Sequence, residues 1–211
     1  MTTARLGLLC LPRSVALAVS DAQLAEEVGF SMVGVADSQS VFREMYTTLA
    51  LCAQTTRRVR IGPSVTNAIT RHPAVAASGI ATVDEIASGR AFFGIGSGDS
   101  AILNLAERPS TLADLRAYIE TVRALHTKGE TTWRGRMVRL TWAKRAIGIY
   151  LSAEGPRTLE LAGEIADGVI VNIGLESTVV RETWWPTCTR ARVALAAIPP
   201  RSTCGRWCAP T

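Results

Sequence analysis

Short apolar runs alternate along the chain with longer segments in which apolar residues recur every three or four positions. The runs begin near residues 6, 31, 59, 91, 147 and 168, and they lack the polar alternation of a half-exposed strand. Segments with helical spacing occupy 22–30, 46–55, 73–88, 110–127 and 158–165. Strands and helices that alternate at this spacing predict an α/β fold built on a parallel sheet.

Local signals mark where several of these elements begin and end. Ser20 and Asp21 predict the start of the first helix and Gly29 its end, while Pro73 suits the first turn of the third helix. The segment 133–140 differs from the others, because its residues alternate around a glycine turn. It predicts a small hairpin inserted between two units.

The repeated unit favours a (β/α) TIM barrel over an open sheet. Polar or glycine residues follow most of the predicted strands at their carboxyl ends, where barrel enzymes place their sites. A complete barrel has eight strands in roughly 250 residues. Because this chain of 211 residues supplies about six strands, we expect an incomplete barrel domain over residues 1–174.

The remaining segment, 175–211, shows no clean helical or strand period. It holds three of the five cysteines and three of the five tryptophans, but no lysine or aspartate. We expect an irregular tail that is read out of frame, disordered, or a truncated replacement for the last two strands. An unclosed barrel leaves two strand edges unpaired, which a second copy of the chain would cover in a homodimer.

Composition limits the partners of the chain. The net charge is +5, but more than half of this excess lies in the tail and no basic face is interleaved with aromatic residues, so nucleic-acid binding is not expected. The first apolar run ends at Pro12 and is too short to span a membrane. Cys10 and Cys52 lie in patterns typical of buried free thiols, which suits a reducing cytoplasm.

An apolar run that ends in a glycine-spaced loop is the most distinctive local motif. Residues 91–100 read AFFGIGSGDS, and Gly96 and Gly98 let the backbone approach a ligand without an intervening Cβ. A dinucleotide fingerprint would need G-x-G-x-x-G and an acidic residue at the end of a following strand. Asp114 and Glu120, the acidic residues near that distance, fall in a predicted helix, so a Rossmann site is not favoured.

Three groups of segments point to one family. They are GPSVTN at 62–67 with TRHP at 70–73, ATVDEIASGR at 81–90 leading into GIGSGDS at 94–100, and YLSAEGPRTL at 150–159 with AGEIADG at 162–168. Together they resemble the bacterial luciferase-like flavin- and deazaflavin-dependent oxidoreductases, most of all the methylenetetrahydromethanopterin reductase branch. The resemblance covers roughly residues 4–174. It implies a (β/α) barrel that holds coenzyme F420, or alternatively FMN, at its carboxyl-end mouth, with hydride transfer at the ring to or from a small-molecule substrate.

The resemblance also implies a set of site residues. The catalytic candidates, expected to face the reactive ring, are Asp37, Asn67 and Glu154. Ser64 and Val65 stand where this branch holds a non-proline cis peptide that backs the ring, and Thr66 would line its edge. Gly96, Ser97 and Gly98 would border the ring or its ribityl chain. Backbone amides at Gly155, Arg157 and Gly174 would cradle the phosphate.

Several of these polar residues have a simpler interpretation. Asp37 suits a cap of the next helix, His72 a helix-entry turn, and Asp167 the turn into the last predicted strand. Asp84 lies in a helix expected outside the barrel, where a solvated or ion-paired surface role is more typical than catalysis. Cys204 and Cys208 lack a second pair of ligands, so no metal site is expected.

The leading hypothesis is an oxidoreductase that transfers hydride between coenzyme F420 and a small organic acceptor or donor. An FMN-dependent monooxygenase on the same barrel is the first alternative. The second alternative is a truncated, non-catalytic remnant of such an enzyme, because strands seven and eight are missing from the pattern.

Overall fold

Parallel strands form a curved sheet in the computed structural model, which describes residues 6–171 and Pro186. Three strands pair in the order β1-β2-β3 and four in the order β4-β5-β8-β9, all in parallel. Their bounds are β1 Gly7–Cys10, β2 Met32–Val35, β3 Arg60–Pro63, β4 Thr66–Asn67, β5 Phe92–Gly96, β8 Gly148–Ser152 and β9 Gly168–Ile170. A bridge between Ile61 and Ala91 joins the two groups into one curved surface.

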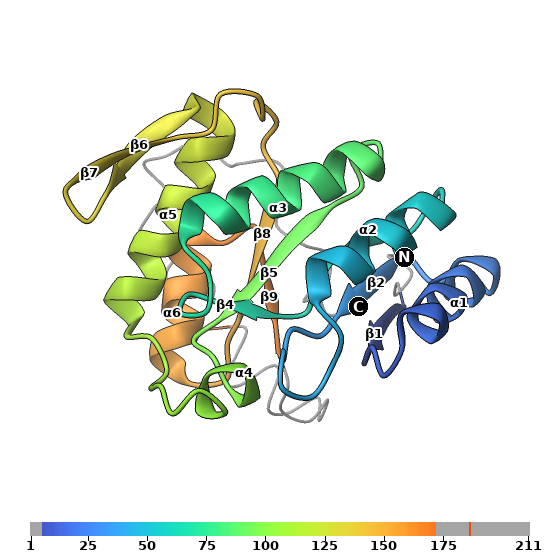
Figure 1. Ribbon diagram of the computed structural model, residues 1–211. Helices are drawn as coiled ribbons and strands as arrows, with labels where there is room; N and C mark the ends of the chain where they lie inside the picture. Colours follow the sequence, from blue (N-terminus) through green and yellow to red (C-terminus); the bar gives the residue numbers. More distant parts are fainter. Residues whose placement is uncertain (1–5, 172–185, 187–211) are drawn as a thin grey trace.

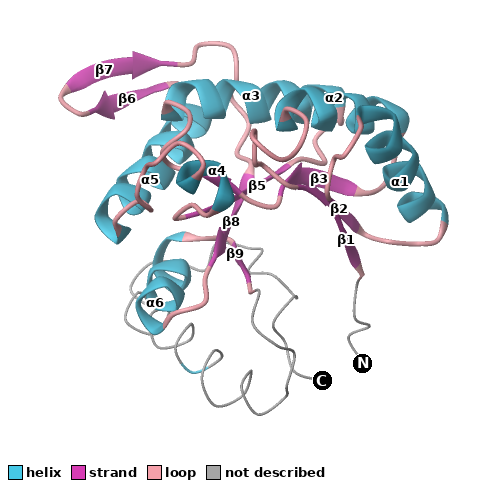
Figure 2. Cartoon of the chain, turned by 60° about the horizontal axis from the view of Figure 1, so that its bottom comes forward, coloured by secondary structure: helices cyan, strands magenta, loops and turns pink. Residues whose placement is uncertain are grey.

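Helices cover the convex face of this sheet (Figures 1 and 2). Their bounds are α1 Val15–Glu27, α2 Met45–Thr55, α3 Pro73–Ile86, α4 Ser100–Leu103, α5 Leu112–Lys128 and α6 Pro156–Ile165. Helices α1 and α2, α2 and α3, α3 and α5, and α5 and α6 contact one another. The predicted alternation of buried strands and outer helices is therefore confirmed for the described part of the chain. None of the helices described there is both long enough and apolar enough to cross a membrane.

The core lies between the sheet and the helices. Alternate strand residues such as Val33, Ile61, Phe93 and Ile149 are fully buried in this layer, as the period of a strand requires. Glycines occupy positions between them. A Cβ at Gly62 would lie 2.0 Å from the Phe92 carbonyl oxygen, so only glycine fits where β3 approaches β5 this closely.

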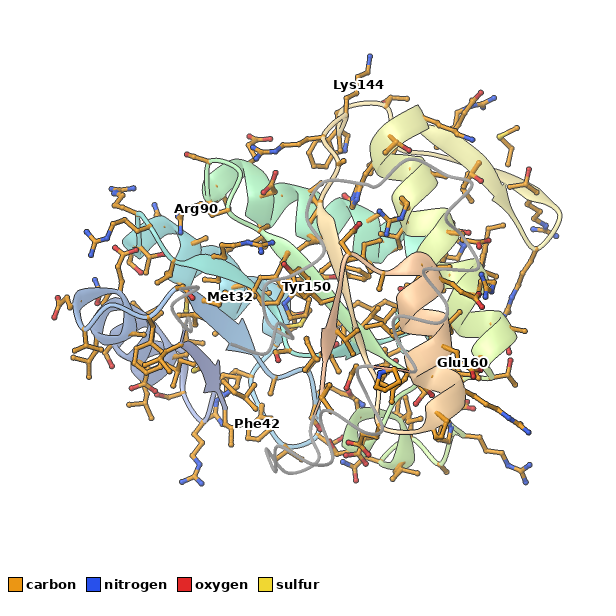
Figure 3. All side chains as sticks on the ribbon, turned by 180° about the vertical axis from the view of Figure 1, so that it is seen from behind. Met32, Phe42, Arg90, Lys144, Tyr150 and Glu160 are labelled. Atoms are coloured by element: carbon orange, nitrogen blue, oxygen red, sulfur yellow. The ribbon has the colours of Figure 1, made fainter. Side chains whose placement is uncertain are left out.

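Aromatic and cationic side chains fill the concave face near the start of the strands. Arg60 donates a hydrogen bond of 2.6 Å from Nη1 to the Tyr150 hydroxyl, and its guanidinium lies 5.8 Å from the centroid of the Phe92 ring. The Phe92 and Tyr150 rings pack edge to face at 5.6 Å. Figure 3 places Tyr150 and Met32 at this inner surface. The concave face is thus closed at the amino ends of the strands.

The predicted hairpin is confirmed. β6 Glu130–Trp133 and β7 Arg136–Arg139 pair in antiparallel fashion. Arg134 and Gly135 between them both have positive φ, which is the geometry of a two-residue hairpin turn. The hairpin projects from the end of α5 (Figure 1).

The expected start of the first helix is wrong. Helix α1 begins at Val15, well before Ser20 and Asp21, and its cap is the Ser14 hydroxyl, which accepts from the Leu17 amide at 3.1 Å. The physical reason is tertiary packing: Ala18 and Ala22 are completely buried, and their small side chains bring the helix close to its neighbours. The short helix α4 follows the glycine-spaced loop and was not predicted.

The end of the expected barrel lies outside the described residues. Within residues 6–171 the sheet order runs from β1 at one end to β9 at the other. The division expected at residue 174 and the segment 175–211, Pro186 apart, fall among positions the structure does not describe. They stay predictions from the sequence.

Candidate active site

A cleft of about 820 Å³ lies at the carboxyl ends of the parallel strands. Each strand of the curved sheet contributes a cleft-lining residue at its carboxyl end or just after it. Ten residues predicted from the sequence line this one cleft: Asp37, Ser64, Val65, Thr66, Asn67, Gly96, Ser97, Gly98, Glu154 and Gly155. Apolar walls come from Leu9, Leu11, Phe42 and Ile170. Figure 3 shows Phe42 in the loop after β2, beside this end of the sheet.

Among the described site candidates, the Arg157 side chain does not line this cleft. The Arg157 side chain is exposed on α6 and lines a separate hollow of about 350 Å³ with Arg116 and Glu164. The prediction concerned its backbone amide, which lies in the first turn of α6, two residues after the cap Gly155. Gly174, the other phosphate candidate of this kind, is outside the described residues.

The peptide bond between Ser64 and Val65 is cis, as the resemblance implied. It lies between β3 and β4 and borders the cleft. Glycines make room for it on both sides. A Cβ at Gly34 would lie 2.4 Å from the Ser64 Cβ, and one at Gly96 would lie 3.3 Å from Val65 Cγ2. The lack of a Cβ at Gly34 in β2 and at Gly96 in β5 therefore lets Ser64 and Val65 lie against the sheet.

Asp37 forms a buried ion pair with Arg71, which was not predicted. Arg71 Nη1 lies 2.5 Å from Asp37 Oδ2 and Nη2 lies 3.2 Å from Oδ1, so the contact is bidentate. The Thr66 hydroxyl also donates to Oδ2, at 2.6 Å. The Asp37 side chain is only 3% exposed. Both of its oxygens are therefore engaged, although the residue borders the cleft.

Asp37 does not cap the following helix. That cap is Glu44, whose Oε2 accepts from the Thr47 amide at 2.7 Å. Burial would raise the pKa of Glu44, but backbone N–H bonds and the charge of Arg71 lower it overall. The capping interpretation of Asp37 is wrong because the loop after β2 continues to residue 44 before α2 begins.

Arg71 is held on several sides. Its Nη2 also contacts Glu44 Oε1 at 2.9 Å, its guanidinium lies 5.2 Å from the Tyr46 ring centroid, and its carbonyl accepts from the Tyr118 hydroxyl at 3.0 Å. Burial alone would lower the pKa of Arg71, but the hydrogen bond and charge of Asp37 raise it. Arg71 lies in the TRHP motif, yet nothing in the spacing pairs it with a residue 34 positions earlier.

Thr66 and Asn67 offer opposite hydrogen-bonding groups to the cleft. Because the Thr66 hydroxyl donates its proton to Asp37, its remaining capacity is that of an acceptor. Asn67 Oδ1 accepts from the amides of Ile69 and Thr70, at 3.0 and 2.8 Å, which leaves its Nδ2 amide as the donor. An acceptor and a donor thus come from consecutive residues of β4, both of which line the cleft.

A second group of polar side chains that line the cleft was not predicted. Ser100 donates to the Ser38 hydroxyl at 2.9 Å, and Gln39 Nε2 donates to the Ala101 carbonyl at 2.6 Å. Ser38 and Ser100 both line the cleft. These contacts fix the short helix α4 to the loop after β2. Polar residues in the loops that follow two of the predicted strands were the signal that could have identified them.

The remaining candidates have structural partners. His72 Nδ1 accepts from the Ala74 amide at 3.2 Å and caps α3, Asp167 accepts from Ile149 and pairs with Arg123, and Asp84 accepts from Ala91 and contacts Arg145. These simpler interpretations are confirmed, although Asp84 is buried rather than solvated.

Cys10 and Cys52 are buried free thiols, as expected. Burial raises the pKa of Cys10 and raises that of Cys52 to about 12. Both thiols are therefore protonated at neutral pH. Cys204 and Cys208 lie outside the described residues. Within residues 6–171 no three His, Cys, Asp or Glu side chains gather as metal ligands.

Comparison with known proteins shows what the chain as a whole resembles. The family described as Luciferase-like monooxygenase matches residues 6–189. The chain is 37% identical over 160 residues to 5,10-methylenetetrahydromethanopterin reductase of Methanolobus tindarius, covering 72% of this chain and 48% of that protein. The chain thus spans about half the length of the curated relatives it matches.

Solved structures agree on the fold. Coenzyme F420-dependent tetrahydromethanopterin reductase from Methanopyrus kandleri superposes with a TM-score of 0.80 at 26% identity, covering 92% of this chain and 62% of that one. The oxygenating constituent of 3,6-diketocamphane monooxygenase from Pseudomonas putida, in complex with FMN, has a TM-score of 0.74 at 17% identity. It covers 95% of this chain and 65% of its own. At that identity it supports the fold alone.

Proposed function

Because this chain belongs to the luciferase-like monooxygenase family, we propose that its cleft binds coenzyme F420 and supports hydride transfer between that coenzyme and a small organic molecule. The relatives named above support this proposal, since one is named as coenzyme F420-dependent. The cleft volume of about 820 Å³ lies within the range of small-molecule sites. The chain matches about half the length of the 5,10-methylenetetrahydromethanopterin reductases. Their substrate and their activity are therefore assigned to this chain only as a proposal.

The pair formed by Thr66 and Asn67 carries the proposal. A deazaflavin ring has a pyrimidine edge on which carbonyl oxygens and an N–H group alternate. The Thr66 hydroxyl oxygen would accept from such an N–H, and Asn67 Nδ2 would donate to a neighbouring carbonyl. The cis segment at Ser64 and Val65 would lie beneath the ring. The residues present therefore fit the group that the family implies.

The other residues of the cleft would bind and shield rather than react. The first turn of α6, with Gly155 as its cap, would present backbone N–H groups to a phosphate. Gly96, Ser97 and Gly98 would border the ring or its side chain. The coenzyme supplies the hydride when bound. Glu154, exposed at the mouth, is the carboxyl group proposed to contact the substrate.

FMN is the second candidate coenzyme. The FMN complex of the Pseudomonas putida protein shows that this fold also accommodates FMN. The same acceptor and donor pair would fit its pyrimidine edge, so the site geometry alone does not separate the two coenzymes. A homodimer and a cytoplasmic location stay predictions from the sequence.

Titration of the protein with F420 and, separately, with FMN tests the proposal. We expect F420 to bind, with a change in its visible absorption, and FMN to bind more weakly. Binding of FMN alone would support the monooxygenase alternative. Binding of F420 without turnover of any carbonyl or imine compound would support the non-catalytic remnant, and binding of neither would refute the proposed function.

Two substitutions at Asn67 sharpen this test. Asn67→Asp keeps the oxygen that accepts from Ile69 and Thr70 but removes the Nδ2 donor, whereas Asn67→Ala removes both. We expect both to weaken F420 binding and turnover by about tenfold, and Asn67→Ala alone to destabilise the fold as well. Unchanged turnover in both variants would remove Asn67 from the site.

A further inference from the structure

Arg71 stands immediately behind the wall of the cleft. Its side chain is 17% exposed and does not border the cleft itself, whereas its two partners in the chain of contacts, Asp37 and Thr66, both do. The contacts run from the guanidinium to the Asp37 carboxylate and from that carboxylate to the Thr66 hydroxyl. An arginine at this place can affect the cleft only through those two residues.

We propose that Arg71 is a positioning residue of this site, which acts through Asp37 to fix the Thr66 hydroxyl as an acceptor toward the cleft. The inference deepens the proposed function and rests on it, because the acceptor is useful only if a ring with an N–H group binds there.

The direction of the Thr66 hydroxyl follows from the inventory of donors and acceptors. A guanidinium donates only, a carboxylate accepts only, and a hydroxyl does both. The bidentate contact with Arg71 fixes the plane of the Asp37 carboxylate, and Oδ2 then lies 2.6 Å from Thr66 Oγ1. The Thr66 proton is thereby committed to Asp37. A molecule in the cleft meets the lone pairs of Oγ1.

The surroundings of Arg71 explain why the contact is rigid. Glu44 Oε1 accepts a hydrogen bond from Nη2, and the Tyr46 ring packs against the guanidinium. The Tyr118 hydroxyl donates to the backbone carbonyl of Arg71. These contacts come from α2 and α5, so Arg71 connects the loop after β4 to elements on both sides. A lysine at this position would retain the charge but not the two-point contact with Asp37.

A double-mutant cycle tests the proposal, with Arg71→Met, Thr66→Val and the double variant. F420 and FMN are each titrated, and the dissociation constant and the visible absorption of the bound ring are recorded. We expect each single variant to weaken coenzyme binding about three- to tenfold and to shift the absorption band in the same direction. The double variant should bind like Thr66→Val, because once the Thr66 oxygen is absent the loss of Arg71 has no acceptor left to misplace. Arg71→Lys should be intermediate.

Arg123→Met is the matched control. Arg123 is 21% exposed on the side chain, pairs with Asp167 at 3.0 Å and donates to the Ile165 carbonyl, but it does not border the cleft. It should lower the unfolding midpoint as Arg71→Met does and leave coenzyme binding unchanged. Equal loss of binding in Arg123→Met, or multiplicative losses in the double variant, would show that Arg71 supports only the fold.

A crystal structure of Arg71→Met without coenzyme provides a readout that does not depend on the proposed function. We expect the Thr66 hydroxyl to leave its 2.6 Å contact with Asp37 Oδ2. If that contact persists, the inference is overturned even where the coenzyme binds. If the contact is lost but the wild-type protein binds neither F420 nor FMN, Arg71 still orients Thr66, and it is the proposed function that fails.

Discussion

Buried polar side chains in the described residues are nearly all paired, and the exceptions are informative. Thr70 Oγ1 and His126 Nδ1 are buried without a hydrogen-bond partner there. His126 lies on α5 against α3, and its Nε2 is 2.9 Å from the Ala77 carbonyl oxygen. Because a carbonyl accepts only, Nε2 must carry the proton. Nδ1 is therefore an unprotonated acceptor in an apolar interface.

Acid should destabilise the protein through His126. Burial lowers its pKa below the usual value, although the Ala77 carbonyl and Asp84 oppose this and Arg123 reinforces it. As the pH falls through about 6.5, His126 of the unfolded chain binds a proton, whereas His126 of the folded chain stays neutral. Stability is present above that pH and is lost as the pH falls below it, until the folded form titrates as well.

Chemical denaturation between pH 8 and pH 5 measures this loss. We expect His126→Met to reduce the drop in unfolding free energy over that interval relative to wild type. His72→Asn is the control, because His72 is exposed, caps α3, and is the other histidine of the chain. An equal drop in wild type and His126→Met would show that another group is responsible.

Sequence could identify the residues of the site better than their roles. Asp37, Thr66 and Asn67 each follow or form the end of a predicted strand, so their meeting at one edge of the sheet was predictable. Their roles depend on donors that come from elsewhere. Arg71 reaches Asp37 across 34 positions, and Asn67 uses its oxygen on its own loop, and neither contact leaves a spacing pattern.

Among the elements, the inner strands were predictable because their apolar runs are largely buried on both faces, whereas β1 leaves Leu9 exposed. In β3 and β5, for example, Ile61 and Phe93 face the helix layer and are wholly buried. The start of α1 was not predictable, since it depends on how closely Ala18 and Ala22 pack, which is a tertiary property. The close approach of β3 to β5 at Gly62 is of the same kind.

Gly62→Ala should therefore destabilise the sheet. The new Cβ would lie 2.0 Å from the Phe92 carbonyl oxygen, a backbone atom that cannot move without shifting β5. We expect the unfolding free energy to fall by about 2 kcal/mol or more, as overpacking in a core commonly does. Gly148→Ala in β8 is the matched control, because its Cβ would meet nothing closer than 3.6 Å. Equal stability of the two variants would contradict the close approach.

At the scale of the whole molecule, the two groups of strands share one core. The buried cluster runs from Cys10 in β1 to Ala162 in α6 without a break. The connection between the groups within the sheet is narrower, a bridge at Ile61 and Ala91 and a hydrogen bond of 3.1 Å from the Ile61 amide to the Arg90 carbonyl. The contact between helices α2 and α3 adds a second connection on the outer face.

A shared core predicts that both groups of strands open together. Amide hydrogen exchange at β2, in one group, and at β8, in the other, should report the same free energy of opening in wild type. Gly62→Ala acts at β3 but should lower both values by the same amount, because one cluster of buried residues extends across both groups. A loss of protection at β2 with β8 unchanged would show instead that the described residues form two units, with the cleft at the boundary between them.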